Sequence, residues 1–211
     1  MLLKAVFFFI AALMPLSFAG AQGAQRFPSL DASPRAYELA RLVSANNVQN
    51  NVQWRNLAEA SLWASSVNAG QGAEQRALAY MDRINAAAAE LAAASDLPRD
   101  PKERGDYVLT FIHRRFLRNY SELQTRVDEI FVSGRYNCVS SAILYMVLAQ
   151  SVGLDVEGVM TRKHAFVTVA AGSERIDVET TNRFGFDPGN RRDFHDAFGR
   201  TTGFAYVPAG N

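Results

Sequence analysis

The feature that most constrains this chain is the segment from Val139 to Val152, in which almost every residue is apolar or small. The segment contains neither proline nor glycine, and Gly153 follows it as a natural stop for a helix. A helix that is apolar on all sides has to be enclosed by the rest of the protein. The pattern therefore predicts a buried helix in the core of the fold.

Cys138, the only cysteine of the chain, stands directly before this apolar segment. Asn137 is a favoured N-cap residue, so Cys138 is expected in the first turn of the helix. There the unpaired backbone N–H groups and the positive end of the helix dipole favour a thiolate. The same N–H groups can stabilise an oxyanion that develops on an attacked carbonyl. A free cysteine can equally be a small buried hydrophobe, so its position alone does not establish a nucleophile.

The first 21 residues have the layout of a secretory signal peptide. Lys4 precedes an apolar run over residues 5–19, and residues 19–21 match a small-x-small cleavage site. The run is shorter than a spanning helix needs, and Pro15 interrupts it. We therefore expect a periplasmic protein with no stable membrane span after cleavage. An idle thiol risks wrong pairing in an oxidising compartment, which favours a chemical role for Cys138.

Cleavage would leave about 190 residues, enough for one domain with a sizeable core. The formal net charge of the chain is +1, and the loss of Lys4 would bring it to 0. This balance argues against nucleic acid or an anionic membrane as the main partner. One cysteine and three scattered histidines cannot form a zinc cluster, and neither a metal nor an organic cofactor is expected.

The first half of the chain is typical of helices. Ser33 and Pro34 provide an N-cap and N1 signal, and a later segment is rich in the best helix formers. Two prolines between Asp96 and Gly105 mark a break and the best candidate for a domain boundary. The part before this break is either a helical subdomain packed on the rest or a separate partner-binding module. Helices are expected at residues 33–47, 52–67 and 73–95.

The second half changes from helical to strand periodicity after Gly153. Alternating apolar and polar residues indicate strands at residues 155–161, 163–170 and 175–182. The dipeptide Gly172-Ser173 between the last two predicts an antiparallel hairpin. Helices followed by an antiparallel sheet define an α+β fold. A further helix is expected at residues 106–120, with one face formed by Tyr107, Val108, Phe111, Ile112 and Phe116.

Three histidines are candidates for the base that a nucleophilic cysteine needs. His113 is flanked by arginines on a predicted helix, where a partly exposed structural histidine is expected. His195 lies in a polar segment near the C-terminal end and receives the same interpretation. His164 follows a polar turn and opens an apolar strand, a position from which a site residue can project. His164 is therefore the favoured base for Cys138.

Asp177 and Glu179 are the candidates for the acid that orients the histidine. A hairpin centred on its two-residue turn would pair Thr168 with Asp177 and make Glu179 the diagonal neighbour of His164. At about 3.4 Å per residue, Asp177 would lie about 13 Å along the strand from His164. A diagonal neighbour lies about 7 Å away, within reach of a glutamate side chain. The register favours Glu179, and Asp177 stays open as the alternative.

The motifs GRYNCVSSAILY, GLDVEGV, HAFVTV and IDVETTNRFGFDPG together resemble the transglutaminase-like superfamily of papain-like cysteine enzymes, in an exported bacterial branch. The resemblance covers about residues 104 to 190. It implies a Cys-His-acid triad of Cys138, His164 and either Glu179 or Asp177. The acid of this family commonly lies in an Asp-x-Thr pattern, which the sequence Glu-Thr-Thr at Glu179 matches with a glutamate.

One position departs from the family pattern. Val139 stands where many transglutaminases have a tryptophan directly after the nucleophile, which weakens the inference to protein cross-linking. The side chain that assists the oxyanion is therefore not identified by a motif. Tyr136 and Asn137 are candidates by their proximity to Cys138 in the sequence.

The sequence thus predicts a signal peptide at residues 1–21, a helical region at 22–103 and a transglutaminase-like domain at 104–211. The final residues have the pattern of an unfinished strand, so the natural domain could extend further. The expected function is exported, cysteine-dependent acyl transfer on peptide or protein substrates, including envelope components. Water as acceptor would make the protein a peptidase or amidase, and an amine would make it a transglutaminase. The alternative is a non-catalytic periplasmic binding or scaffold module that uses the same fold.

Overall fold

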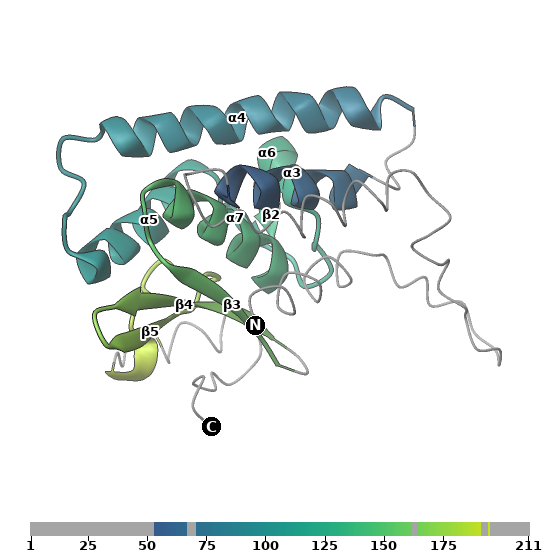
Figure 1. The fold of residues 1–211 in the computed structure, drawn as a ribbon. Helices are drawn as coiled ribbons and strands as arrows, with labels where there is room; N and C mark the ends of the chain where they lie inside the picture. The colour runs from purple at the N-terminus through teal and green to yellow at the C-terminus, as the bar shows by residue number, and fades with distance from the viewer. Residues whose placement is uncertain (1–52, 67–70, 162–163, 191–193, 195–211) are drawn as a thin grey trace, which may run out of the picture.

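The computed structural model describes residues 53–66, 71–161, 164–190 and 194. Within these ranges, helices precede a small antiparallel sheet, so the protein has an α+β fold (Figure 1). The predicted signal peptide, the helix expected at residues 33–47, His195 and the final segment lie outside the described residues. The elements are α3 (Gln53–Ser66), α4 (Ala73–Ala93), α5 (Pro101–Arg115), β1 (Asn119–Tyr120), α6 (Val127–Ser133), β2 (Arg135–Tyr136), α7 (Cys138–Ser151), β3 (Val156–Met160), β4 (Ala165–Ala171), β5 (Glu174–Val178) and η2 (Pro188–Asn190).

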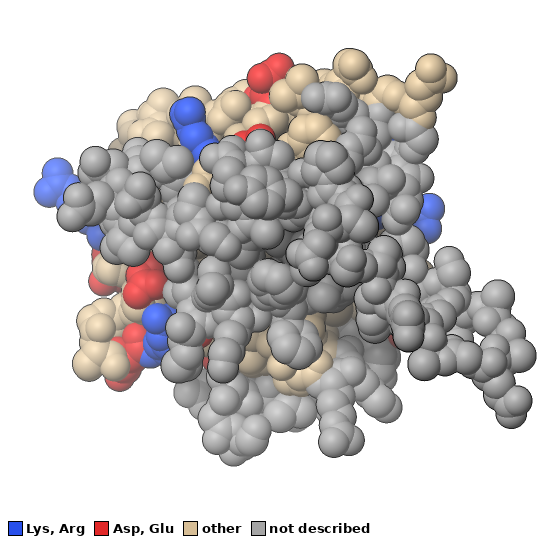
Figure 2. Space-filling model, turned by 45° about the vertical axis from the view of Figure 1, so that its right-hand side comes forward, with Lys and Arg blue, Asp and Glu red and all other residues tan. Residues whose placement is uncertain are grey.

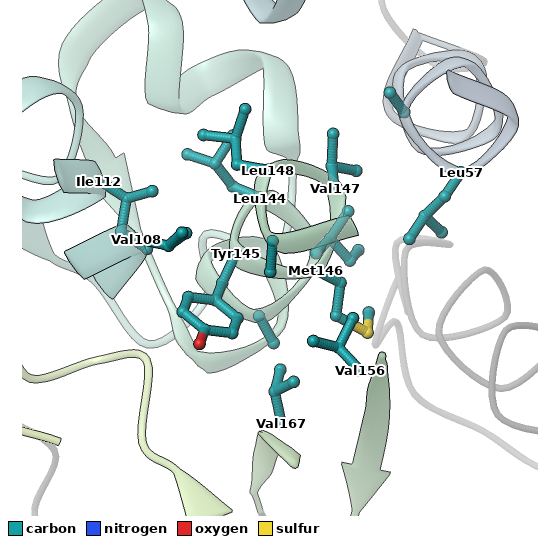
Figure 3. Close-up of a cluster of buried hydrophobic side chains, with 14 of the residues drawn as sticks. Leu57, Val108, Ile112, Leu144, Tyr145, Met146, Val147, Leu148, Val156 and Val167 are labelled. Atoms are coloured by element: carbon teal, nitrogen blue, oxygen red, sulfur yellow. The ribbon is translucent and has the colours of Figure 1, made fainter. Parts of the chain in front are cut away.

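Helix α7 lies between the other helices and the sheet (Figure 1). Every residue from Val139 to Ala149 is buried, which confirms the prediction from its sequence. A helix with no polar face gains its stability by packing on several partners at once. Figure 3 shows the surrounding side chains, which are Leu57 of α3, Val108 and Ile112 of α5, Val156 of β3 and Val167 of β4.

Both ends of α7 are closed by local hydrogen bonds. Asn137 is the predicted N-cap, and its side chain accepts from the backbone N–H groups of Val139 and Ser140 at 3.0 and 3.1 Å. The Ser140 hydroxyl in turn accepts from the Asn137 N–H at 3.0 Å, which completes a capping box. At the other end, Gly153 adopts a left-handed φ of 81°, as a residue that terminates a helix commonly does.

Helices α3 and α4 pack on each other, and both also contact α7. Their buried residues, such as Leu62 and Leu91, belong to the same hydrophobic core as those of α5 and α7. The side-chain hydroxyl of Ser65 also accepts a hydrogen bond from the Val127 N–H at the start of α6. The described helices of the first half therefore lie on the central helix instead of standing apart from it.

The boundaries predicted for α5 were wrong at both ends. The helix begins at Pro101 instead of Asp106, because Asp100 caps it by accepting from two backbone N–H groups and proline suits the first helical position. It ends at Arg115, and Asn119–Tyr120 form the short strand β1. The proline-rich break therefore holds the start of a helix and not only a linker.

The main sheet has the order β3-β4-β5 with antiparallel pairing throughout. Thr168 faces Asp177 in the β4–β5 hairpin, which confirms the register expected from its two-residue turn. Gly172 in this turn has a φ of 65°, a conformation that glycine adopts at little cost. The predicted extent of β5 was wrong, since the strand ends at Val178 and the chain turns away at Glu179.

The sequence patterns did not indicate the second, two-stranded sheet. Strands β1 and β2 pair in parallel, with Tyr120 opposite Tyr136. Strands of two residues are too short to show a period, so alternation could not reveal them. The pair brings the segment after α5 alongside the residues that lead into α7.

Among the described residues visible in Figure 2, basic and acidic side chains are interspersed. This agrees with the balanced composition of the chain. None of the described helices combines the length and the apolar character that crossing a bilayer requires.

Candidate active site

Cys138 is the first residue of α7 and is partly exposed. Asn137 uses its side chain to cap the N–H groups of the next two residues, and its carbonyl accepts from the Ser141 N–H at 3.0 Å. The N–H of Cys138 itself has no acceptor among the described residues. The thiol thus lies beside an available backbone donor at the positive end of a helix.

His164 directly precedes β4, and the residue across the β3–β4 turn holds its backbone. The Thr161 N–H donates to the His164 carbonyl at 2.8 Å, and the His164 N–H donates to the Thr161 hydroxyl at 3.0 Å. The imidazole stacks on the Phe166 ring, with centroids 6.4 Å apart, and the side chain is only 11% exposed. Both the backbone and the ring of His164 are therefore held in place.

Glu179 is fully buried and forms a hydrogen bond to the His164 ring through Oε2 and Nε2. Its other oxygen, Oε1, accepts from the Thr181 N–H at 3.0 Å and from the Thr181 hydroxyl at 2.6 Å. A buried carboxylate is costly unless donors surround it, and here three donors share its two oxygens. The Glu-Thr-Thr sequence therefore supplies an acid together with the residue that fixes its orientation.

Cys138 lies close enough to the His164 ring to raise the pKa of the histidine. Because Nε2 is engaged by Glu179, the buried Nδ1 is the ring nitrogen that can serve Cys138. Burial lowers the pKa of His164, but the hydrogen bonds to Cys138 and Glu179 and their negative charges outweigh it and raise the pKa to about 9. The imidazolium is thus the favoured form at neutral pH. Three residues from α7, the start of β4 and the end of β5 meet in one site.

Asp177, the alternative acid, lies opposite Thr168, four residues along β4 from His164. Its register position is thus the one expected from the sequence, about 13 Å along the strand from the histidine. Glu179 directly follows the last residue of β5, and its side chain reaches the His164 ring from there. Of the two acids, Glu179 is the one with a hydrogen bond to the imidazole in this structure.

Tyr136 and Asn137, the candidates for assisting the oxyanion, are both buried and both engaged within the protein. The Tyr136 hydroxyl donates to the Thr181 carbonyl at 3.2 Å. The Asn137 side chain caps α7 through Oδ1 and donates through Nδ2 to the Glu122 carbonyl at 2.8 Å. These contacts give both side chains a structural task beside the site.

Three side chains from other elements hold the segment Glu179–Thr181 in place. His113 of α5 donates from Nε2 to the Thr180 carbonyl at 3.0 Å. The hydroxyls of Ser141 and Thr180 form a hydrogen bond of 2.8 Å, and the Tyr136 hydroxyl reaches the next carbonyl. Glu179 is thus anchored through the following residues to α5, β2 and α7, the helix that begins with Cys138.

Sequence reasoning assigned His113 a structural role on a partly exposed helix face, and did not connect it with the site. The exposure was predicted correctly, because the side chain is partly exposed. Burial is the main cause that lowers its pKa to about 4, with Arg183 adding to the effect against the Thr180 hydrogen bond. A neutral ring can donate from Nε2 at neutral pH. Its position four residues after the buried Leu109 is the signal that it borders the core face.

Gly185 makes the tightest backbone approach in the site. A Cβ atom at this position would lie 2.0 Å from the Glu179 carbonyl oxygen and 2.9 Å from that of Asn182. The Glu179 N–H donates to the Gly185 carbonyl at 2.7 Å, and Val178 forms an isolated bridge with Phe186. The loop after β5 therefore closes on itself only because residue 185 has no side chain.

A cavity of about 460 Å³ lies away from these residues, between α4, α5 and α6. Two of the arginines that line it are already engaged: Arg83 donates to the Phe131 carbonyl and Arg115 pairs with Glu90. It contains none of the predicted site residues. Within the described ranges, no three or more His, Cys, Asp or Glu side chains gather as a metal site would need.

Comparisons of the chain with protein-family models and with curated proteins returned no match. The kind of site is therefore indicated by the arrangement of Cys138, His164 and Glu179. A thiol at a helix N-terminus, a histidine beside it and a carboxylate behind the histidine are the groups that a nucleophile, a base and an orienting acid require.

Proposed function

We propose that this protein is a cysteine-dependent acyl-transfer enzyme of transglutaminase-like type, acting as a peptidase or amidase through Cys138, His164 and Glu179. The observation that carries the proposal is the His164 ring, which has Glu179 hydrogen-bonded to Nε2 and lies close enough to Cys138 for the cysteine to raise its pKa. Such a chain of contacts activates a thiol, whereas a buried structural cysteine needs none of it.

The reaction begins from a thiolate on Cys138 and an imidazolium on His164. The sulfur attacks the amide carbonyl carbon, and a C–S bond forms while the carbonyl electrons move to oxygen. The backbone N–H of Cys138 donates to this oxyanion. When the oxyanion collapses, the C–N bond breaks and His164 gives its proton to the leaving amine. Cys138 then carries the acyl group as a thioester.

Hydrolysis of the thioester reverses the roles. The neutral His164 takes a proton from water as the water oxygen attacks the thioester carbonyl. Collapse expels the Cys138 thiolate and releases a carboxylic acid. Glu179 keeps the imidazole oriented in both halves and stabilises its charged form. An amine in place of water would give transglutamination by the same steps.

The papain-like fold is part of the proposal. It is supported by a buried helix that carries the cysteine at its first residue and packs on β3 and β4 of an antiparallel sheet. The histidine precedes β4, and the acid follows the paired strand β5. The resemblance of the motifs around these residues points to the same class.

Export to the periplasm follows from the signal-peptide pattern of residues 1–21. With this location, peptides or proteins of the cell envelope are the proposed substrates. A single thiol in that compartment is best explained by a use for its chemistry.

Alkylation with iodoacetamide at pH 6.5, followed by mass spectrometry, tests the proposal. Cys138 is the only cysteine, so every alkylated chain reports on this site. The folded wild type should react faster than the chain in denaturant at the same pH, and His164→Ala should lose the difference. A Cys138→Ser variant gives the background, and circular dichroism establishes that the variants are folded.

A cysteine probe that acylates, such as an activated peptide ester, provides the second arm. The wild type should form a thioester and turn over. If Cys138 is inert in the folded protein and becomes reactive only in denaturant, the catalytic proposal is wrong. A reactive thiol that never becomes acylated by any peptide ester would instead favour the non-catalytic binding module.

A further inference from the structure

The segment that follows α5 runs along the start of the nucleophile helix. Tyr120 of β1 pairs in parallel with Tyr136 of β2, two residues before Cys138. The Ser121 N–H donates to the Tyr136 carbonyl at 2.7 Å, and the Asn137 side chain donates to a carbonyl one residue further along this segment. Neighbouring strands lie about 4.8 Å apart, so Tyr120 is held one strand away from the residues that lead into the nucleophile.

The same contacts continue into the helix itself. The Ser140 hydroxyl, on the first turn of α7, donates to the Gln124 carbonyl at 3.0 Å. The segment from Tyr120 to Gln124 is therefore bonded at its start to the residues that lead into α7 and at its end to the first turn of α7, which contains Cys138. Its position relative to the thiol is fixed by backbone and capping hydrogen bonds.

The side chain of Tyr120 faces inward and is partly buried, whereas its neighbour Asn119 is exposed. Its ring stands edge-on to the Tyr136 ring, with centroids 5.9 Å apart, and packs on the same core as Cys138. The two tyrosines differ in one respect. The Tyr136 hydroxyl is committed to the Thr181 carbonyl, but the Tyr120 hydroxyl has no hydrogen-bonding partner among the described residues.

The electrostatic surroundings keep this hydroxyl protonated. Burial raises the pKa of Tyr120 well above its usual value of 10, and the negative charges of Cys138, Glu122 and Glu179 raise it further. Cys138 is the largest of these charge effects, in agreement with the proximity that the strand pairing implies. At neutral pH, Tyr120 is a neutral phenol whose O–H group can donate.

We propose that the Tyr120 hydroxyl is the side-chain donor of the oxyanion site, acting together with the backbone N–H of Cys138. The inference rests on the proposed acyl transfer at Cys138. Tyr120 donates a hydrogen bond to the carbonyl oxygen as negative charge develops, and keeps its proton throughout. It takes the role for which sequence proximity had suggested Tyr136 and Asn137.

Two reagents separate this role from the activation of the thiol. Iodoacetamide alkylates a thiolate by direct displacement and forms no oxyanion. Acylation by p-nitrophenyl acetate passes through a tetrahedral oxyanion and releases p-nitrophenolate. Tyr120→Phe should therefore leave the alkylation rate within about twofold and lower the acylation rate by about 10²-fold, as the loss of one oxyanion donor does.

Tyr107→Phe is the matched control, because the Tyr107 hydroxyl bonds to Asp96 and belongs to no part of the site. This variant should keep both rates. An unchanged acylation rate in Tyr120→Phe would overturn the inference, and so would an equal fall in both rates, which would indicate a role in the thiol or the fold. A wild type that neither alkylates nor acylates overturns the proposed function itself.

Discussion

His113 and Glu179 are hydrogen-bonded to the same peptide group. Nε2 of His113 donates to the Thr180 carbonyl, and the Thr181 N–H of that peptide donates to Oε1 of Glu179. The histidine lies on α5, and the contact spans 67 residues of sequence. Burial disfavours the doubly protonated, charged form of the His113 ring, so the ring that donates this hydrogen bond is neutral at neutral pH. The position of the proposed acid therefore depends on a group that titrates in the acidic range.

Acidification is expected to destabilise the fold through His113. Its folded pKa of about 4 is below the ordinary 6.5, so protons bind the unfolded chain first as pH falls. The contribution of neutral His113 to the free energy of unfolding is complete above pH 6.5. It declines by on the order of 3 kcal/mol as the pH falls toward 4. Urea unfolding at pH 7, 5.5 and 4 measures the decline. His113→Gln keeps a donor but cannot titrate, and it should show a smaller decline; equal declines would contradict the assignment.

Raising the pH should also destabilise the fold, through His164, because the folded pKa of this histidine is raised and not lowered. Its folded pKa of about 9 exceeds the ordinary 6.5. The stability that it contributes is therefore fully present below pH 6.5 and lost as pH rises through about 9. The unfolding free energy of the wild type should fall more between pH 7 and 10 than that of His164→Gln. A parallel pH dependence in both proteins would exclude the charged pair with Glu179.

Glu179→Gln should slow the alkylation of Cys138 at pH 6.5 by about tenfold or more, because each 1.4 kcal/mol of lost ion-pair stabilisation is a factor of ten. The amide cannot stabilise an imidazolium as a carboxylate does. Asp177→Asn is the matched control, since Asp177 lies opposite Thr168 at a distance from the ring. The reverse outcome, with Asp177→Asn the slower variant, would transfer the role of the acid to Asp177.

Gly185→Ala should destabilise the protein by about 1–3 kcal/mol, the usual cost of overpacking. The new Cβ atom would meet the Glu179 carbonyl oxygen at 2.0 Å, so the loop has to shift and carry the acid with it. Alkylation at pH 6.5 should slow as well. Gly189→Ala is the control, because a Cβ there meets nothing within 4 Å. Thermal unfolding of the two variants distinguishes them, and equal melting temperatures would contradict the steric argument.

The parts of the fold that could be predicted are those in which neighbouring residues decide the structure. The almost wholly apolar segment after Cys138 predicts a buried helix, and Asn137 and Gly153 mark its ends. The short turn at Gly172 fixed the hairpin register, since a two-residue loop leaves few alternatives. The hairpin register and the position of the buried helix together predict that Cys138, His164 and Glu179 belong to one site.

The parts that could not be predicted depend on contacts between distant residues. Nothing near Glu179 in the sequence announces the end of β5, because the bend is stabilised by Gly185 and by His113 from another element. The parallel pairing of Tyr120 with Tyr136 is likewise long-range and only two residues long. Sequence proximity to Cys138 therefore points to Tyr136 and Asn137, whereas Tyr120 comes near Cys138 only through the strand pair.

The central position of α7 has a consequence for how the protein acquires its reactivity. A helix with no polar face is marginal by itself and is completed here by α3, which lies far earlier in the chain. Contacts of such long sequence separation form late and slowly. Thiol reactivity toward alkylation should therefore return late in refolding, after most of the far-UV helical signal, so that Cys138 reports on the completion of folding.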